Sequence, residues 1–217
     1  MVNKKKLFLD TSNFLWAEVL IMISGVISFP ILTRIFSKEQ YGLFSLIGVT
    51  ITILMGVSSL GVSRSLLRFY EKYKKSGQQS SLLSTLTISV LLSGAAFITG
   101  SIIVYSAISH KWISIQTALL PISVALAWMV MQNVFVLFNT VFRMEGRILR
   151  YNINGLVRKY GSLLVAIPLV LHLNSLTSFY VGMITVEIAL ILMIYFLLKK
   201  DFHIGSLETR LFSKEIF

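Results

Sequence analysis

Glu187 is an acidic residue in the middle of a strongly apolar part of the sequence. It lies 11 residues after Leu176, within the apolar run 176–198. If this run crosses a membrane, a charge near its centre costs on the order of 2.5–3.5 kcal/mol on insertion scales, so Glu187 should face protein or water rather than lipid. Two roles fit this position: a site for a coupling proton or cation, or a polar group hydrogen-bonded to a neighbouring helix.

Arg158 and Lys159 are adjacent cations that precede a short apolar stretch. From Tyr160 to Leu173 there are only 14 residues, which as a helix cover about 21 Å. Because the hydrocarbon core is ~30 Å thick, a spanning helix must begin near Ile153, and both cations are then drawn into the membrane. They either extend to its surface or line a hydrated cavity, where they would bind an anionic group.

Two further polar features belong to apolar runs. Gln132, Asn139 and Arg143 are spaced by 7 and 4 residues, which places them on one stripe of a helix. Such a stripe avoids lipid, and it either makes interhelical hydrogen bonds or lines a cavity. Glu18 lies about 7 Å along a helix from Phe14, so we expect it at the level of the lipid headgroups, with an ion-coupling role as the alternative.

Other cations lie at the ends of the apolar runs. Arg34 ends the first run, where an interfacial anchor is the simple interpretation and a contact with a sugar phosphate is the alternative. Arg64, Arg68, Lys72 and Lys75 have the spacing i, i+4, i+8, i+11 of one helix face. Binding of anionic lipid headgroups is the simplest explanation of that face, and recruitment of a lipid-linked substrate is the alternative.

Six apolar runs can position these residues. They are residues 14–35, 41–63, 82–108, 115–141, 153–173 and 176–198. About 20 helical residues cross a membrane, and helices satisfy their own backbone hydrogen bonds in lipid. A soluble domain carries about 25% charged residues, whereas this chain of 217 residues has 13% charged and 55% hydrophobic residues. We therefore predict an all-α membrane bundle of six transmembrane helices.

The distribution of positive charge predicts the orientation of this bundle. Of the 20 lysines and arginines, 17 fall on the side of the N-terminus if the six runs alternate across the membrane, and 3 fall on the other side. Positive charge accumulates in the cytoplasm, so both termini should be cytoplasmic. The net charge of +11 is thus explained by topology, and we expect no nucleic-acid partner.

Short connections predict which helices are neighbours. Residues 36–40 and 174–175 are the only links between the first and second runs and between the fifth and sixth, which makes each pair antiparallel. In the first link, Ser37 and Gln40 fit a capping box, with Ser37 as N-cap. Gly42 follows, where we expect a close approach of the two backbones.

The residues that enzymes use for acid–base, nucleophilic or metal chemistry are scattered or missing. The chain has no cysteine, its aspartates are Asp10 and Asp201, outside the apolar runs, and its histidines are His110, His172 and His203. Walker A, HExxH and GxSxG patterns do not occur. We therefore predict neither an enzyme nor a bound cofactor or metal.

Three segments together resemble a known family. Residues 32–42 (LTRIFSKEQYG), 60–70 (LGVSRSLLRFY) and 142–151 (FRMEGRILRY) are similar to the helix 1–2 hairpin, the end of helix 2 and the helix 4–5 loop of bacterial polysaccharide flippases. These are the O-antigen and capsule exporters of the multidrug/oligosaccharidyl-lipid/polysaccharide superfamily. The segments occur in the family's order, and the likeness covers nearly the whole chain.

The resemblance implies a function and partners. It implies translocation of a polyprenyl-pyrophosphate-linked oligosaccharide across the bacterial cytoplasmic membrane by alternating access, for cell-surface polysaccharide biosynthesis. The family has two six-helix lobes, so residues 1–200 would form the N-terminal lobe and residues 201–217 a tail leading to the second lobe, or the chain would pair with a second half-transporter. The residues expected to bind cargo are Arg158, Lys159, Arg143, Asn139, Gln132, Arg64, Arg68 and Arg34.

Two other functions fit these residues less well. A multidrug or small-molecule cation antiporter of the same superfamily would favour an apolar, acidic cavity, whereas Arg158, Lys159 and Arg143 suit an anionic cargo. A purely structural membrane protein has no use for Glu187 in the middle of a span. The flippase remains the favoured interpretation, with the antiporter as the alternative.

Overall fold

The computed structural model describes residues 4–59, 61–109 and 119–202, and this part of the chain consists of helices without strands. The helices in chain order are α1 (Lys4–Ile35), α2 (Lys38–Ser58), α3 (Val62–Lys75), α4 (Gln79–Ser109), α5 (Leu119–Met144), α6 (Ile148–Leu173) and α7 (Leu176–Phe202). All except α3 are long and apolar enough to cross a membrane. The predicted bundle of six spanning helices is confirmed, and the chain is a multi-pass membrane protein.

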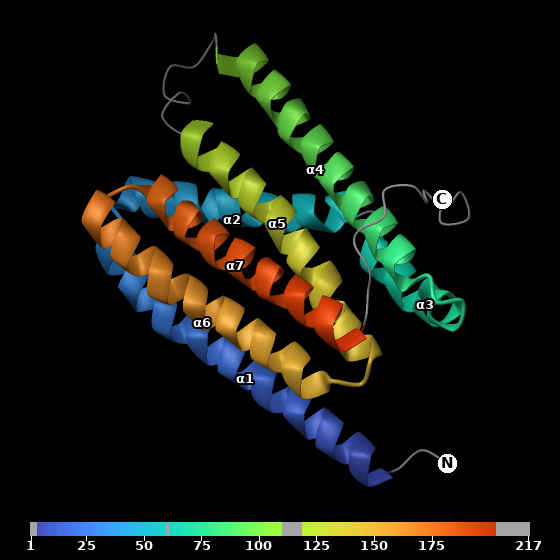
Figure 1. The fold of residues 1–217 in the computed structure, drawn as a ribbon. Coiled ribbons are helices and arrows are strands. Elements are labelled where there is room, and N and C mark those ends of the chain that lie inside the picture. The colour runs from blue at the N-terminus through green and yellow to red at the C-terminus, as the bar shows by residue number, and fades with distance from the viewer. Residues whose placement is uncertain (1–3, 60, 110–118, 203–217) are drawn as a thin grey trace.

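The spanning helices form a bundle with α7 at its centre (Figure 1). α7 packs between α5 and α6, α1 runs along α6, and α4 runs along α5. α2 crosses behind this layer in the view of Figure 1 and contacts α1, α4 and α5. The predicted start of the fourth run, at 115–118, and the predicted tail from 203 onward lie outside the described residues.

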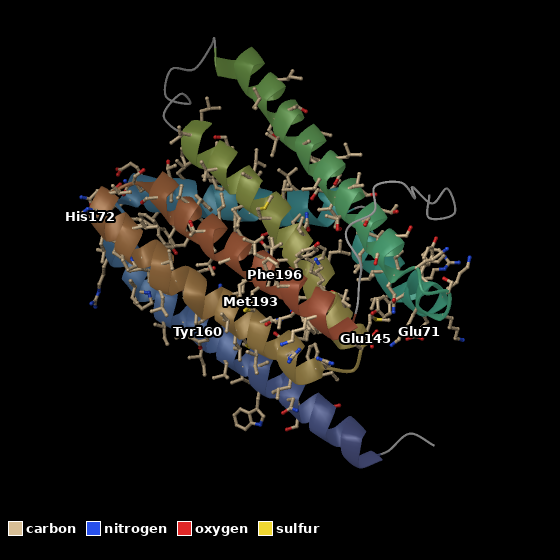
Figure 2. All side chains as sticks on the ribbon, viewed as in Figure 1. Glu71, Glu145, Tyr160, His172, Met193 and Phe196 are labelled. Carbon is tan, nitrogen blue, oxygen red and sulfur yellow. The ribbon has the colours of Figure 1, made fainter. Side chains whose placement is uncertain are left out.

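Apolar side chains cover the outer faces of the bundle, as a lipid environment requires. Met193 and Phe196 project from α7 (Figure 2), and their side chains are 42% and 64% exposed. In water these faces would be a large unfavourable apolar surface. In a membrane they meet lipid tails of the same polarity.

The α1–α2 hairpin is fixed by the predicted capping box. The hydroxyl of Ser37 accepts a hydrogen bond from the backbone N–H of Gln40 at 3.2 Å, and the backbone N–H of Ser37 donates to Oε1 of Gln40 at 3.1 Å. The expected close approach at Gly42 is wrong, because a methyl group added there would meet nothing within 4 Å.

The predicted second span is wrong at its C-terminal end. α2 stops at Ser58 rather than continuing to residue 63, and Gly61 adopts a left-handed backbone with φ of 71° before α3 begins at Val62. Glycine takes this conformation without steric cost. The turn separates the span from a short helix with a different environment.

α3 has two opposite faces of different chemistry. Its apolar side chains, buried against α4 and α5, are Val62, Leu66, Tyr70 and Tyr73. Its opposite face carries the exposed cations Arg64, Arg68, Lys72 and Lys75, while the exposed Lys74 is paired with Glu145. Each of the first four cations follows a buried residue by two positions, a rotation of about 200° around a helix. The helical spacing of these cations in the sequence thus corresponds to a real helix.

Small residues allow α6 and α7 to pack closely. A methyl group added to Gly182 on α7 would lie 2.7 Å from the Cα of Ala166 on α6. The two helices are joined through Asn174, which has φ of 47° and closes α6 by donating its N–H to the carbonyl of Val170. Asparagine tolerates this left-handed conformation. The chain therefore reverses within two residues, as the sequence predicts.

Candidate functional site

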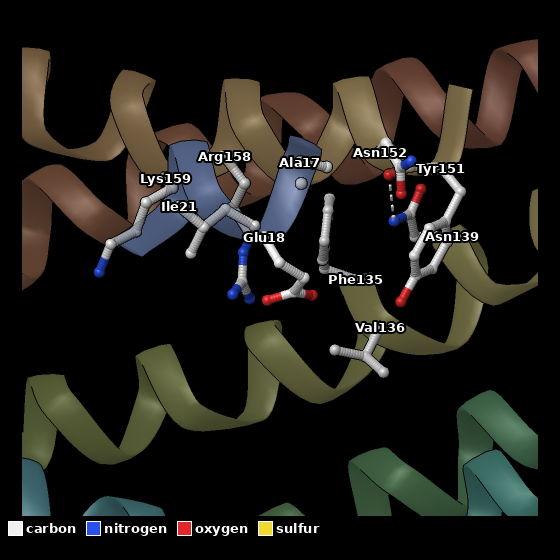
Figure 3. Close-up of a pocket in the computed structure, with 11 residues that line it drawn as sticks. Ala17, Glu18, Ile21, Phe135, Val136, Asn139, Tyr151, Asn152, Arg158 and Lys159 are labelled. Carbon is white, nitrogen blue, oxygen red and sulfur yellow. Dashed lines mark hydrogen bonds between the residues drawn. The ribbon is translucent and has the colours of Figure 1, made fainter. Parts of the chain in front are cut away.

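A polar cavity lies between α1, α5 and α6, within the membrane-spanning part of the bundle (Figure 3). Its volume is about 150 Å³. Four of the predicted site residues line it: Glu18 from α1, Asn139 from α5, and Arg158 and Lys159 from α6. We call this space the first cavity.

Arg158 and Glu187 form an ion pair between α6 and α7. The distance between Nη1 of Arg158 and Oε1 of Glu187 is 3.4 Å, and their side chains are 26% and 1% exposed. The guanidinium also lies over the ring of Phe135, 5.0 Å from its centroid. Glu187 thus faces protein rather than lipid, and its partner reaches the first cavity.

Glu187 has one charged partner among the described residues, Arg158. Among the described residues no three His, Asp or Glu side chains are close enough to hold a metal ion together. The indole N–H of Trp128 is within electrostatic reach of Glu187 but does not make a hydrogen bond of normal geometry. Arg158 is therefore the side chain that stabilises the buried carboxylate.

A second cavity lies between α1, α2, α5, α6 and α7 and has a volume of about 400 Å³. Gln132 and Lys159 line it, so Lys159 lies on the wall of both cavities. On α1, for example, the first cavity is lined at Ala17 and Glu18 and the second at Ser28. The second cavity is therefore deeper in the bundle, farther from the end with the excess of positive charge.

Asn139 belongs to an interhelical hydrogen-bond network as well as to the first cavity. Its side-chain amide donates to the carbonyl of Tyr151 at 3.1 Å, and its Oδ1 accepts from Nδ2 of Asn154 at 2.8 Å. Asn152 in turn donates to the carbonyl of Asn13 on α1 at 3.0 Å. Both alternatives left open for Asn139 thus hold. Asn152 and Asn154 were not predicted as site residues, although their amides also belong to a spanning helix.

The remaining predicted residues lie outside both cavities. Arg34, Arg64, Arg68 and Arg143 are exposed, and neither cavity is lined by any of them. The guanidinium of Arg143 lies 5.5 Å from the ring centroid of Phe14. Gln132, Asn139 and Arg143 share a stripe of α5, but Gln132 lines the second cavity, Asn139 lines the first, and Arg143 lines neither.

Glu145, in the turn between α5 and α6, ties this turn to α3 (Figure 2). Its carboxylate accepts hydrogen bonds from the hydroxyl of Tyr70 at 2.6 Å and from Nζ of Lys74 at 2.7 Å. Burial alone would raise the pKa of Glu145, but the bonds from Lys74 and Tyr70 and the charges of Lys74 and Arg147 outweigh it, and the pKa is lowered. Burial, followed by the bond to Glu145, raises the pKa of Tyr70. This link was not predicted.

Comparison with known proteins assigns a family. The model of a family described as polysaccharide biosynthesis protein matches residues 10–214. No curated protein and no solved structure matches the chain. The match covers all six spanning helices and both cavities.

Proposed function

Because the chain belongs to the polysaccharide biosynthesis protein family, we propose that it is a lobe of a flippase for a lipid-linked oligosaccharide. The observation that carries this proposal is the pair of cations, Arg158 and Lys159, on the wall of a cavity inside a membrane-spanning bundle. Cations within spans are rare and usually mark a pathway for substrate or ions. An anionic headgroup is the ligand that such a pair would bind.

The cations Arg158 and Lys159 indicate that the group bound in the first cavity is anionic. A guanidinium and an ammonium both make charge-assisted hydrogen bonds to phosphate oxygens. Glu187 neutralises Arg158 from the α7 side, at 3.4 Å, and holds it in place while the cavity is empty. A pyrophosphate that enters the first cavity competes with Glu187 for Arg158. In this mechanism cargo binding releases the Glu187 carboxylate to take up a coupling proton or cation.

Translocation requires two alternating states. We place the chain in the bacterial cytoplasmic membrane, with the excess of positive charge at the cytoplasmic face. A second six-helix lobe, in the same protein or in a second half-transporter, would close the substrate path. Rocking of the lobes would then expose the oligosaccharide on the outer face while the polyprenyl chain stays in lipid.

The exposed cations on the outer face of α3 support a role in attracting anionic lipids and the lipid-linked cargo to the bundle. They face away from the bundle core, and their stripe runs along the predicted cytoplasmic face. A basic stripe of this kind attracts anionic lipid headgroups. It would hold anionic lipids, including the lipid-linked cargo, next to the bundle before the cargo enters.

The cation antiporter is not favoured by the site. Arg158 and Lys159 outnumber Glu18 among the charged residues that line the first cavity, and the carboxylate of Glu187 is already paired with Arg158. An organic cation would have to enter against this charge. Membership of the polysaccharide biosynthesis protein family also favours a transporter over an enzyme.

The proposal is tested by flipping of a fluorescent polyprenyl-pyrophosphate oligosaccharide in proteoliposomes that contain the complete transporter. Arg158→Ala should slow flipping at least tenfold, and Arg158→Lys should retain more activity if charge rather than the planar fork of donors is needed. Arg150→Ala is the matched control, because Arg150 is an exposed arginine of the same helix and lies outside both cavities. Wild-type flipping by Arg158→Ala at equal protein level would refute the role of the first cavity.

The coupling role of Glu187 needs a separate measurement. Glu187→Gln keeps the size of the side chain and its hydrogen-bonding capacity but cannot titrate in this range. Flipping by this variant should lose its response to an imposed proton or sodium gradient. A normal response would leave Glu187 with the structural role of holding Arg158.

A further inference from the structure

The second cavity has the composition of a ligand site rather than of a packing defect. Its volume of about 400 Å³ lies in the range of small-molecule pockets, about 300–1,000 Å³, and far exceeds the ~30 Å³ of one water molecule. Five helices contribute side chains to its wall. A void of this size inside a bundle calls for an occupant.

Buried polar atoms on its wall have no protein partner. Among the described residues, neither Oε1 of Gln132 nor the hydroxyl of Tyr180 makes a hydrogen bond, although both atoms are buried. The Tyr180 side chain is only 2% exposed. Buried polar groups are normally satisfied by protein or by a bound molecule. These two atoms therefore point to an occupant with hydroxyl or amide groups.

The rest of the wall defines the chemistry of that occupant. Aromatic rings surround the space: Trp128 and Tyr180 lie with ring centroids 6.1 Å apart, and Phe44 lies 6.4 Å from Tyr180. Lys159 is the charged residue among the described residues that line the cavity. Its ammonium disfavours a cationic ligand, while the aromatic faces and neutral polar atoms favour a ligand with apolar faces and polar edges.

We propose that the second cavity binds a neutral sugar ring of the cargo, an inference that rests on the proposed flippase function. A sugar ring places C–H groups against aromatic faces and presents hydroxyls that both donate and accept. The hydroxyl of Tyr180 can do either, and Oε1 of Gln132 accepts. Lys159 borders both cavities, so a pyrophosphate held in the first cavity places its attached sugar at the entrance of the second.

The test measures sugar binding directly through Trp128. In a variant with Trp16→Phe and Trp112→Phe, Trp128 is the single tryptophan. The protein is kept in a detergent without a sugar headgroup and titrated with glucose, N-acetylglucosamine or rhamnose up to about 100 mM, since single sugars bind weakly. At least one sugar should shift the Trp128 emission and saturate.

Variants of the unpaired atoms connect this signal to the cavity. Tyr180→Phe should weaken sugar binding about tenfold, as expected for a lost hydrogen bond in a buried site. It should not lower the thermal stability of the empty protein, because its hydroxyl has no protein partner. Tyr195→Phe, on the same helix but away from both cavities, is the matched control and should bind as the parent does.

Several outcomes would overturn the inference. A saturable shift that Tyr180→Phe leaves unchanged would place sugar binding elsewhere. If no sugar shifts the emission, the cavity is not a sugar site, and quenching of Trp128 by a bromoalkane would then assign it to a lipid chain. A parallel experiment measures whether inorganic pyrophosphate raises the thermal stability of the protein, and whether Arg158→Ala abolishes this effect. If pyrophosphate stabilises the protein but no sugar binds, the sugar site is refuted and the proposed flippase function is not. If pyrophosphate does not stabilise the protein, the anion site of the proposed function is refuted.

Discussion

The ion pair between Arg158 and Glu187 allows a quantitative prediction of stability. Methionine at either position removes one charge and keeps an unbranched apolar chain of similar length. Arg158→Met leaves a carboxylate that is 1% exposed without its partner, whereas Glu187→Met leaves a guanidinium that is 26% exposed and borders the first cavity. The two single substitutions should therefore differ in cost.

The expected magnitudes follow from this burial. Removing one partner of a buried pair costs about 3–5 kcal/mol. We expect about 3 kcal/mol for Arg158→Met, and only about 1.5 kcal/mol for Glu187→Met because the remaining arginine is less buried and borders the first cavity. Replacing both partners of a buried pair by apolar residues is often close to neutral. The double variant should therefore be no less stable than Glu187→Met alone, with a loss of about 1.5 kcal/mol. The coupling energy between the two positions is then about 3 kcal/mol.

The assay is reversible unfolding in mixed micelles by increasing fractions of a denaturing detergent, followed by circular dichroism. The four proteins of the cycle are compared at equal lipid and salt concentration. A second cycle, made from Arg34→Met and Glu187→Met, is the control. The stability change of its double variant should equal the sum of the two single changes within about 0.5 kcal/mol, because the two residues are not in contact.

The reasoning fails if the effects of Arg158→Met and Glu187→Met simply add. Additivity would mean that the distance of 3.4 Å carries no interaction free energy and that each residue is stabilised by something else. A larger cost for Glu187→Met than for Arg158→Met would contradict the argument from burial, since the more exposed charge would then be the harder one to leave unpaired.

Three further predictions concern topology, helix packing and pH. A cysteine at Gln78 should be shielded from an impermeant thiol reagent in intact cells and one at Lys38 labelled; the chain has no other cysteine to interfere, and the reverse pattern would invert the orientation. Gly182→Ala should cost about 1–3 kcal/mol of stability by forcing α6 and α7 apart, whereas Gly100→Ala, which meets nothing within 4 Å, should cost almost nothing; equal effects in unfolding experiments would contradict the close contact. Glu145→Gln should cost about 1 kcal/mol at neutral pH, a value reduced because Lys74 is 39% exposed. Because the pKa of Glu145 is lowered from 4.5, its stabilising contribution is complete above about pH 5 and is lost as the pH falls through its folded-state pKa. The stability difference between wild type and Glu145→Gln should therefore shrink in acid, and a difference that grows in acid would show the opposite shift.

Sequence alone was sufficient for the spanning helices because their signal is local. Each run is apolar over the length of a membrane, and the capping box at Ser37 depends on residues three positions apart. The end of α2 could not be placed, since hydropathy continues through the left-handed turn at Gly61. Hydropathy averages over many residues, whereas a turn is set by one.

The site was harder to predict because its geometry depends on packing between helices. Arg158 and Glu187 were recognised separately, but their contact spans 29 residues in the chain. The short connection between α6 and α7 makes the two helices antiparallel neighbours, and this was the one feature of the sequence that could have predicted the contact. Tyr180 and Trp128 gave no such signal, because an aromatic residue in a span has the same sequence pattern whether it faces lipid or a cavity. Arg34 and Arg143 lie outside both cavities, and their contacts with cargo stay predictions.

The tight turn at Asn174 has a consequence for how the chain is made. α6 and α7 emerge consecutively during synthesis, and each alone carries an ionisable residue that is costly in lipid, on the order of 2.5–3.5 kcal/mol. Because only Asn174 and Ser175 separate the two helices, they can leave the translocation channel together as a hairpin, with Arg158 already paired with Glu187. Lengthening this turn would delay the pairing and expose each nascent helix to lipid with its charge uncompensated. The short turn thus allows α6 and α7 to enter the membrane as a pair in which the charges of Arg158 and Glu187 compensate each other.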